Sequence, residues 1–527
     1  MAVTAPWSRI ERIVFLAVCL ATLFFAILTP PFQAPDENQH YMKALALAQG
    51  HVVTEIQDDR IGAELPRAAV DLHAVDFPTE PDGKRHRYDK AMIDRAWSAD
   101  AARPGTRFAE FPNVASYAPT LYAPGAVGLA IGDALGLPRI GAFYAGRIAN
   151  ALTALLLLAA ALRLIPFGRM ALLGTALLPT FCYQIGSLSP DAVINGIGFL
   201  CLTLALRVGF MAPDRASAAA TLVTAPLLAL AKGVYLPLMA AGLRWPSRAS
   251  LLRNALILSA MLLGAVIFAV WMKANGGSQA LYHITSRKTG ESVLTAPLAQ
   301  QLAVILADPA GYVRILVSSI VERAPVYALQ IVGRFGWNAI LLPLLAYPLA
   351  LLMLGSAVLS GSGARFGLGQ RLWWLAIALG TALLIETAMY LTGTPLGADY
   401  VQGTQGRYFL PLLPLVLLAL MPANPLRGAR LLCAGAGLAL LIIAMLSAWD
   451  SFWIHGFVTA DGMPPIPFKL LAHKAHELGL VTGISVHGFN RWSWAEGEFE
   501  INGQRERVPL DALAVKYGDG AGAAQKV

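Results

Sequence analysis

The chain has 527 residues, of which 56% are hydrophobic and only 14% are charged. A soluble protein carries about 25% charged residues, so this composition excludes a water-soluble globular protein. The formal net charge is +8. Its arginines gather at the ends of apolar segments, as the positive-inside rule expects of membrane proteins, so the charge does not indicate a nucleic-acid partner.

The first apolar segment, residues 10–29, follows the basic residue Arg9 and includes Arg12. It resembles a signal peptide, but it has no small-residue cleavage site and continues into Pro30-Pro31-Phe32. We therefore expect an uncleaved first membrane helix.

Apolar runs of membrane-helix length predict about eleven transmembrane helices in an all-α polytopic membrane protein. Their expected ranges are 10–29, 140–162, 170–187, 191–211, 217–231, 234–243, 252–273, 337–358, 372–392, 408–421 and 429–448. A further apolar segment, 118–136, is assigned to a half-buried helix on the outer side. With that choice, every loop between spans that is rich in arginine lies on the side of the N-terminus, which places that side in the cytoplasm.

The same topology predicts the domain organisation. Residues 1–448 form the transmembrane domain, with two large outer loops at 30–138 and 274–336. Residues 449–527 form a small outer C-terminal region, with a helix expected at 468–480. Within it, the turn Asn502-Gly503 between two short runs predicts a β-hairpin.

The segment Pro35-Asp36-Glu37-Asn38-Gln39-His40 places two carboxylates and an imidazole directly after the first span. Asp36 and Glu37 either cap the start of a helix or provide a general base at the membrane surface. His40 lies one helical turn after Asp36, where it could orient that carboxylate, donate to a phosphate or serve a purely structural role.

A second polar segment, Gln405-Gly406-Arg407-Tyr408, precedes the apolar run 408–421. A guanidinium binds phosphate through two parallel hydrogen bonds, so Arg407 suits a lipid-linked phosphate or pyrophosphate. The alternative is an interfacial arginine anchored beside a tyrosine, Tyr408.

Isolated charges elsewhere extend the set of candidates. Lys232 lies at a tight outer turn and suits an anionic headgroup, or pairs with Asp191, and Arg334 is a further candidate phosphate contact. Asp191 either caps its helix or supplies another carboxylate. Arg147 and Glu386 lie within predicted spans and need an ion-pair partner or a cavity. The four cysteines and nine histidines show no metal-ligand spacing, so the sequence indicates no cofactor and no metal site, although a divalent metal is compatible with it.

These motifs resemble the GT-C superfamily of glycosyltransferases that use polyprenyl-phosphate donors. Within it, the chain is most similar to an uncharacterised bacterial family marked by Pro-Asp-Glu-x-x-His and Gln-Gly-Arg-Tyr-x-x-Pro, which occur here at 35–40 and 405–411. The turn Ala231-Lys232-Gly233 resembles the family's Lys-Gly turn near the donor. Tyr117–Tyr122 and Gly146-Arg147-Ile148 resemble the helix after the first loop and the first returning span, whereas Pro190 before Asp191 departs from the pattern.

The resemblance implies a GT-C-like bundle in the bacterial inner membrane, with its site at the periplasmic surface. It implies transfer of a sugar from a polyprenyl-phosphate donor to a glycan or lipid-linked acceptor, with inversion at the anomeric carbon. The acidic role falls on Asp36, with Glu37 beside it. The residues expected to bind the donor phosphate are Arg407, Lys232 and Arg334, together with His40 and Tyr408. Arg147 and Asp191 are expected to support these residues. A transporter, flippase or polymerase of lipid-linked sugars is the alternative.

Overall fold

The computed structural model describes residues 6–58, 60–77, 85–99, 103–212, 214–245, 247–275, 298–458, 496–501 and 504–509. The chain divides into two compact units, which we describe separately. The first contains residues 1–79 and 87–456, and the second contains residues 80–86 and 457–527.

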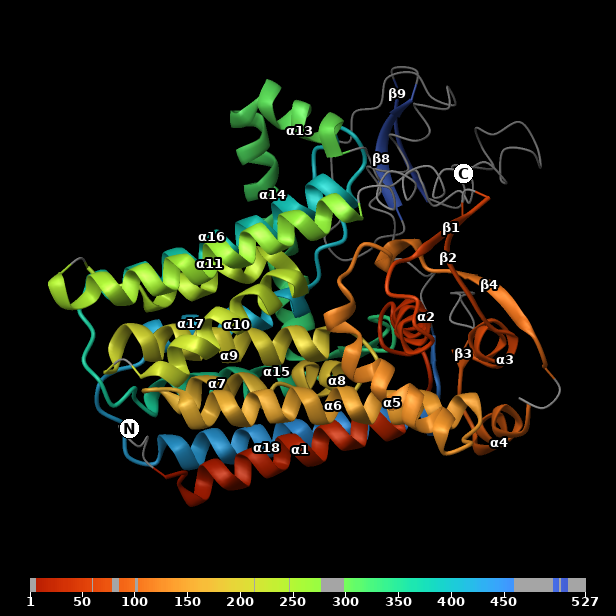
Figure 1. Ribbon diagram of the computed structural model, residues 1–527, viewed down its shortest axis with the longest axis horizontal. Coiled ribbons are helices and arrows are strands. Elements are labelled where there is room, and N and C mark those ends of the chain that lie inside the picture. Colours follow the sequence, from red (N-terminus) through yellow and green to blue (C-terminus); the bar gives the residue numbers. More distant parts are fainter. Residues whose placement is uncertain are drawn as a thin grey trace. The chain divides into compact units, whose positions relative to one another are not determined.

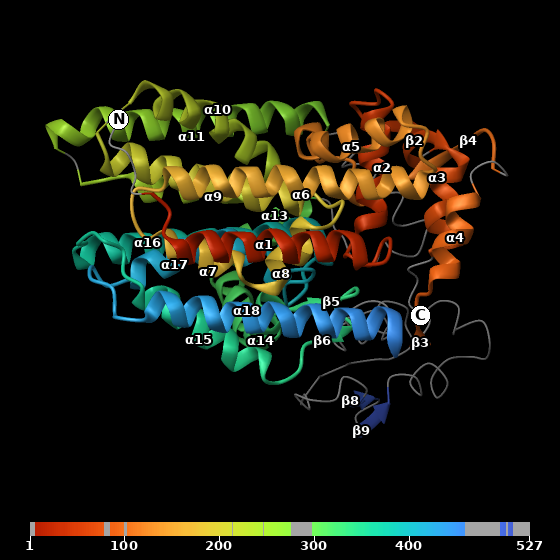
Figure 2. The same ribbon diagram turned by 90° about the horizontal axis from the view of Figure 1, so that it is seen from below.

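The first unit is a helical bundle in which the longest helices run side by side, as both ribbon views show (Figures 1 and 2). Eight helical segments within the described residues are long and apolar enough to cross a membrane. They are α1 (Arg9–Leu28), α6 (Arg139–Leu164), α9 (Asp191–Phe210), α10 with the 3₁₀ segment η5 (Arg215–Lys232, Gly233–Gly242), α11 (Arg248–Ala274), α14 (Pro309–Val332), α16 (Leu368–Gly393) and α18 (Ala429–Trp449). An all-α polytopic membrane protein is thus confirmed.

Several expected spans are shorter or interrupted. They form α7 (Arg169–Ala176) with α8 (Pro179–Ile185), α15 (Ala346–Leu359), and η7 (Gly406–Leu412) with α17 (Leu413–Leu420). The expected span 170–187 is divided because Pro179 lacks the N–H that would continue the preceding helix, and it begins α8 instead. The expected span 337–358 begins with a two-stranded turn, β5 (Arg334–Phe335) and β6 (Ile340–Leu341).

Residues 274–336, expected as an outer loop, contain α13 (Leu298–Ala307) and α14. Hydrogen bonds join the two ends of α14 to other helices of the bundle. Its Tyr312 donates to Thr387 near the end of α16, and the carbonyl of Gln330 accepts from Thr180 at the start of α8. Because a helix of 24 residues is about 36 Å long, α14 can connect these two helices.

The first large loop, 30–138, is more structured than its composition suggests. It contains α2 (Glu37–Ala48), α3 (Arg67–Asp71) with the π-helical turn η1 (Leu72–Asp76), α4 (Lys90–Ser98), the turns η3 (Pro112–Val114) and η4 (Pro119–Leu121), α5 (Ala123–Ala134), and the antiparallel sheet β1-β2-β4 (Glu55–Gln57, Arg60–Pro66, Thr106–Glu110). The sheet was not expected. α5 has 12 residues, about 18 Å, too short to cross a hydrocarbon core, which agrees with the half-buried helix expected at 118–136.

In the second unit, β3 (Arg85–His86) pairs with β7 (Phe457–Val458). β8 (Glu496–Ile501) pairs antiparallel with β9 (Gln504–Pro509), with Ile501 opposite Gln504, so the predicted hairpin is confirmed. The turn residues 502 and 503 and the expected helix at 468–480 lie outside the described residues.

Candidate functional site

Asp36 lies at the point where the chain turns from α1 into α2. It occupies the N-cap position with φ of +62°, a left-handed conformation, and its side chain makes no hydrogen bond to the helix. Asparagine and aspartate tolerate this conformation better than other non-glycine residues. The Asp36 carboxylate is therefore turned away from the usual capping position, and 35% of the side chain remains exposed.

Arg407 brings the two halves of the chain together at Asp36. One terminal nitrogen lies 3.1 Å from an Asp36 oxygen, and the other lies 3.6 Å from an oxygen of Asp191. The Arg407 side chain is only 8% exposed. Its Nε is buried and has no hydrogen-bond partner among the described residues. Such an orphaned N–H next to a partly open carboxylate is suited to an anionic ligand.

Asp191 is the first residue of α9, and neither it nor Pro190 forms a side-chain cap. Its carboxylate faces Arg407 instead. The structure thus shows no cap by the Asp191 side chain; its carboxylate forms an ion pair with Arg407, and its supply of a second carboxylate to the site stays a prediction.

Lys232 reaches the same cluster from the end of α10. Its ammonium lies 3.9 Å from the centroid of the Tyr408 ring, and the Arg407 guanidinium carbon lies 5.3 Å from the same ring. Tyr235 holds the Tyr408 backbone by donating its hydroxyl to the carbonyl at 2.8 Å. The aromatic ring of Tyr408 therefore positions both cations by cation–π contact.

His40 lies on the same face of α2 as Asp36, and its ring nitrogen Nδ1 lies 2.9 Å from the Tyr122 hydroxyl. The ring also stacks on Tyr117. The pKa of His40 is lowered to about 4, chiefly by burial; the carboxylates of Asp36 and Asp191 oppose this lowering, and the cations Arg407 and Lys232 add to it. His40 is consequently neutral at pH 7.

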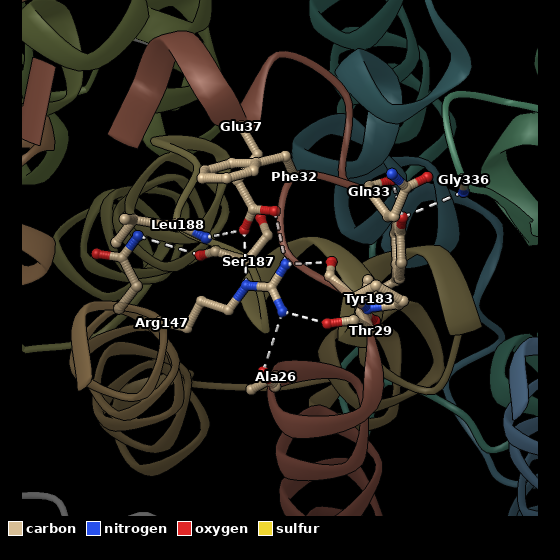
Figure 3. Close-up of polar contacts among 12 residues, drawn as sticks. Ala26, Thr29, Phe32, Gln33, Glu37, Arg147, Tyr183, Ser187, Leu188 and Gly336 are labelled. Atoms are coloured by element: carbon tan, nitrogen blue, oxygen red, sulfur yellow. Dashed lines mark hydrogen bonds and ion pairs between the residues drawn. The ribbon is translucent and has the colours of Figure 1, made fainter. Parts of the chain in front are cut away.

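Glu37, the immediate neighbour of Asp36, lies in a different environment. Its carboxylate is fully buried and forms two hydrogen bonds with Arg147, at 2.8 and 2.6 Å (Figure 3). It also accepts from the backbone N–H of Leu188 at 2.8 Å. Arg147 donates its remaining hydrogens to the carbonyls of Ala26, Thr29 and Pro30 at the end of α1. This pair joins α1, α2, α6 and the turn before α9, and no oxygen of Glu37 is open to a substrate.

Arg334 lies on β5, and its Nε donates to the backbone carbonyl of Asn338 within the β5–β6 turn. It lines a narrow cleft together with Arg407, Pro35, Gln330 and Tyr183. The cleft therefore has guanidinium groups from two separate elements. Burial lowers the pKa of Arg334, but not enough to remove its charge at neutral pH.

Glu386 is separate from the Asp36 cluster. It accepts a hydrogen bond from Thr404 at 2.9 Å, three residues before Arg407. Within the described residues there is no group of three or more His, Cys, Asp or Glu side chains arranged to hold a metal ion.

Seven of the nine predicted site residues thus lie at one end of the bundle around Arg407 and its cleft: Asp36, His40, Asp191, Lys232, Arg334, Arg407 and Tyr408. Glu37 and Arg147 form the adjoining buried pair. Sequence reasoning did not assign Tyr117, Tyr122 and Tyr235 to the site. Tyr117 and Tyr122 stand in a motif that was recognised, but nothing in a single sequence shows that their rings turn toward His40.

Comparison with known proteins gives one match. A model of the family described as predicted membrane protein (DUF2142) matches residues 19–416, so the chain belongs to that family. No curated protein and no solved structure matches the chain.

Proposed function

We propose that this family member is an inverting glycosyltransferase that moves a sugar from a polyprenyl-phosphate donor to a cell-envelope glycan or a lipid-linked acceptor. The reaction would take place at the outer, periplasmic face of the bacterial inner membrane. The observation that carries this proposal is the buried, partly unpartnered guanidinium of Arg407 held against the half-open carboxylate of Asp36.

The donor phosphate would lie at Arg407. The free Nε–H of Arg407 can donate to a phosphate oxygen, and Lys232 and Arg334 add positive charge from two other elements. Tyr408 fixes two of these cations, and neutral His40 supports the aromatic wall beside them. The polyprenyl chain would leave the site along the apolar helices.

In the proposed step, Asp36 accepts the proton of an acceptor hydroxyl while that oxygen attacks the anomeric carbon. The bond from this carbon to the phosphate oxygen breaks, and its electron pair stays on the phosphate. Protonation removes the negative charge that Asp36 presents to Arg407 in the resting site. Arg407 is then free to stabilise the additional charge on the departing phosphate, so proton transfer and leaving-group stabilisation are coupled.

Glu37 and Arg147 take a structural role in this proposal. Their pair is fully buried and connects the turn that carries Asp36 to the end of α1 and to α6. It fixes where α2 begins and therefore where Asp36 stands. Asp191 holds the second side of Arg407.

The first test replaces Asp36 with Asn, which keeps the size of the side chain and tolerates the left-handed backbone. Purified protein in detergent would be given synthetic polyprenyl-phosphate hexoses and aminopentoses with extracted envelope glycans. Loss of a general base should lower the transfer rate by about 100-fold or more while the melting temperature stays close to wild type. Asp133→Asn, at a carboxylate paired with Arg139 at 2.7 Å, is the matched control and should transfer normally.

An Asp36→Asn variant with the wild-type rate would remove Asp36 as the base. Transfer only from pyrophosphate-linked donors would indicate a polymerase. Movement of the lipid-linked sugar across the membrane of vesicles that contain the protein, with no sugar transfer in detergent, would indicate a flippase or transporter.

The second test concerns Arg407 and uses binding of a synthetic polyprenyl phosphate to the protein in nanodiscs. Charge-assisted hydrogen bonds contribute about 1.5–3 kcal/mol each, so Arg407→Gln should weaken binding at least about 10-fold. Arg407→Lys keeps the positive charge but loses the parallel N–H donors of the guanidinium. Its affinity for polyprenyl phosphate should lie between those of wild type and Arg407→Gln. Arg139→Gln serves as control, because Arg139 pairs with a surface carboxylate. Unchanged affinity in a folded Arg407→Gln protein would contradict its assignment to the phosphate.

A further inference from the structure

A second polar cavity lies on the first large loop, lined by residues other than those of the Asp36–Arg407 cluster. Its volume is about 460 Å³, within the range of sites that hold small organic ligands, roughly 300–1,000 Å³. The first turns of α2, the π-helical turn η1 and the edge strand β4 form its walls. Asn38 and Gln39, which line it, follow Asp36 by two and three residues in the chain.

Two amide side chains, those of Asn38 and Gln39, line this cavity. The side-chain oxygens of Asn38 and Gln39 are buried and have no hydrogen-bond partner among the described residues. The Asn38 amide nitrogen lies 3.1 Å from Nε2 of His73. Burial lowers the pKa of His73 to about 4, so the imidazole adds no charge to the cavity at pH 7. Buried acceptors of this kind are costly unless a ligand donates to them.

The opposite wall combines charge with an aromatic face. The Arg60 guanidinium lies 4.8 Å from the centroid of the Phe108 ring, and its ion pair with Glu110 is long, at 3.9 Å. Arg107 also lines the cavity, and its contact with Asp71 is 3.5 Å. The charged lining residues are Arg60, Arg107 and Glu110, so the wall carries one net positive charge. Both arginines keep donors that a carboxylate on a ligand can take up.

We propose that this cavity binds the saccharide part of the acceptor, and that the saccharide carries an acidic group. The identification of the saccharide as part of the acceptor rests on the proposed function, whereas the binding site itself does not. Hydroxyl groups of the sugar would donate to Asn38 and Gln39, its apolar face would pack on Phe108, and its carboxylate would meet Arg60 or Arg107. Because Asn38 and Gln39 follow Asp36 by two and three residues in the first turn of α2, α2 would connect acceptor binding with the base.

The experiment measures binding of two trisaccharides, one of uronic acids and one of neutral hexoses, to the full-length protein in nanodiscs by saturation-transfer NMR and calorimetry. The acidic trisaccharide should bind more tightly, and added salt should weaken it. Gln39→Ala and Arg60→Ala should each weaken its binding about 10-fold. Arg67→Ala is the matched control, because Arg67 is a similarly exposed arginine of the same loop that does not line the cavity, and its binding should stay within twofold of wild type.

Melting temperatures and polyprenyl-phosphate affinity, both expected to be unchanged in these variants, show whether each protein is folded. Binding of neither trisaccharide, wild-type affinity for the acidic trisaccharide in both the Arg60→Ala and the Gln39→Ala protein, or tighter binding of the neutral trisaccharide would overturn the inference. Trisaccharide binding without sugar transfer from any donor would contradict the proposed function while leaving the cavity assigned. Transfer whose acceptor KM is the same in Gln39→Ala and wild type would contradict only the cavity.

Discussion

Asp36 and Glu37 are adjacent carboxylates with opposite surroundings. Asp36 keeps a partly exposed side chain in a left-handed turn, whereas Glu37 is enclosed by Arg147 and the Leu188 backbone N–H. The local sequence does not distinguish the environments of the two residues, because both follow Pro35 at the start of a helix. The residue that distinguishes them, Arg147, stands 110 positions further along the chain.

Replacing Glu37 with Gln should destabilise the protein rather than affect chemistry directly. Removing one charge of a buried ion pair leaves the other unpaired and costs roughly 3–5 kcal/mol. We expect a large fall in melting temperature and, in the protein that remains folded, normal polyprenyl-phosphate affinity. Asp36→Asn should instead keep a melting temperature close to wild type and lose transfer activity. A Glu37→Gln protein as stable as wild type would contradict the structural role of the pair.

His40 predicts a pH dependence of stability. Its pKa is about 4 in the folded protein and 6.5 without burial, so the unfolded chain binds more protons between these values. Stability from neutral His40 is complete above pH 6.5 and falls as the pH drops toward 4, by about 3 kcal/mol over the whole interval. His40→Gln should reduce the dependence of melting temperature on pH between 7 and 4.5, and the remaining dependence comes in part from His73, whose pKa burial also lowers to about 4. His51→Gln, at a partly exposed histidine of the same loop, should keep the wild-type dependence.

At the scale of elements, α5 packs against α6 through glycines. A Cβ at Gly128 would lie 2.5 Å from the backbone oxygen of Ala145, and one at Gly132 would lie 2.6 Å from the Cα of Ala142. The obstructing atoms are mostly backbone, so they cannot move aside as a flexible side chain would. The close approach holds the end of α6 that carries Arg147 near α2.

Gly128→Ala should therefore separate α5 from α6 and destabilise the protein by about 1–3 kcal/mol. Faster proteolysis of the first loop and a lower melting temperature would report the change. Gly355→Ala is the matched control, because a Cβ there meets no atom within 4 Å and alanine favours the helix. Equal melting temperatures for the two variants would show that the close approach is not needed.

At the scale of the whole molecule, the arrangement of charged loops sets an expected orientation. The Arg244–Arg248 turn and α4 lie at opposite ends of the first unit (Figure 1). From the positive-inside rule we expect the arginine-rich end in the cytoplasm and the Asp36 cluster outside.

Cysteine labelling in intact cells tests this orientation. Lys90→Cys on α4 and Trp245→Cys in the arginine-rich turn are both highly exposed positions, at 85% for the Lys90 side chain and 92% for Trp245. A membrane-impermeant maleimide should label position 90 in whole cells and position 245 only after the membrane is opened. The reverse pattern would place Asp36 in the cytoplasm and contradict the proposed periplasmic reaction.

Local sequence was enough to predict the membrane class, the long apolar helices, a short helix near 118–136, the C-terminal hairpin and most of the polar residues that gather at one end. These follow from local hydrophobicity, turn residues and motif spacing. Tertiary contacts were needed to show how α14 lies against the bundle and that the first loop contains a sheet with a cavity. They were also needed to show that Glu37 forms its ion pair with Arg147, whereas Asp36 forms its ion pair with Arg407. Ion-pair partners and helix direction depend on contacts between segments up to 371 residues apart, and hydropathy in a local window carries no information about them.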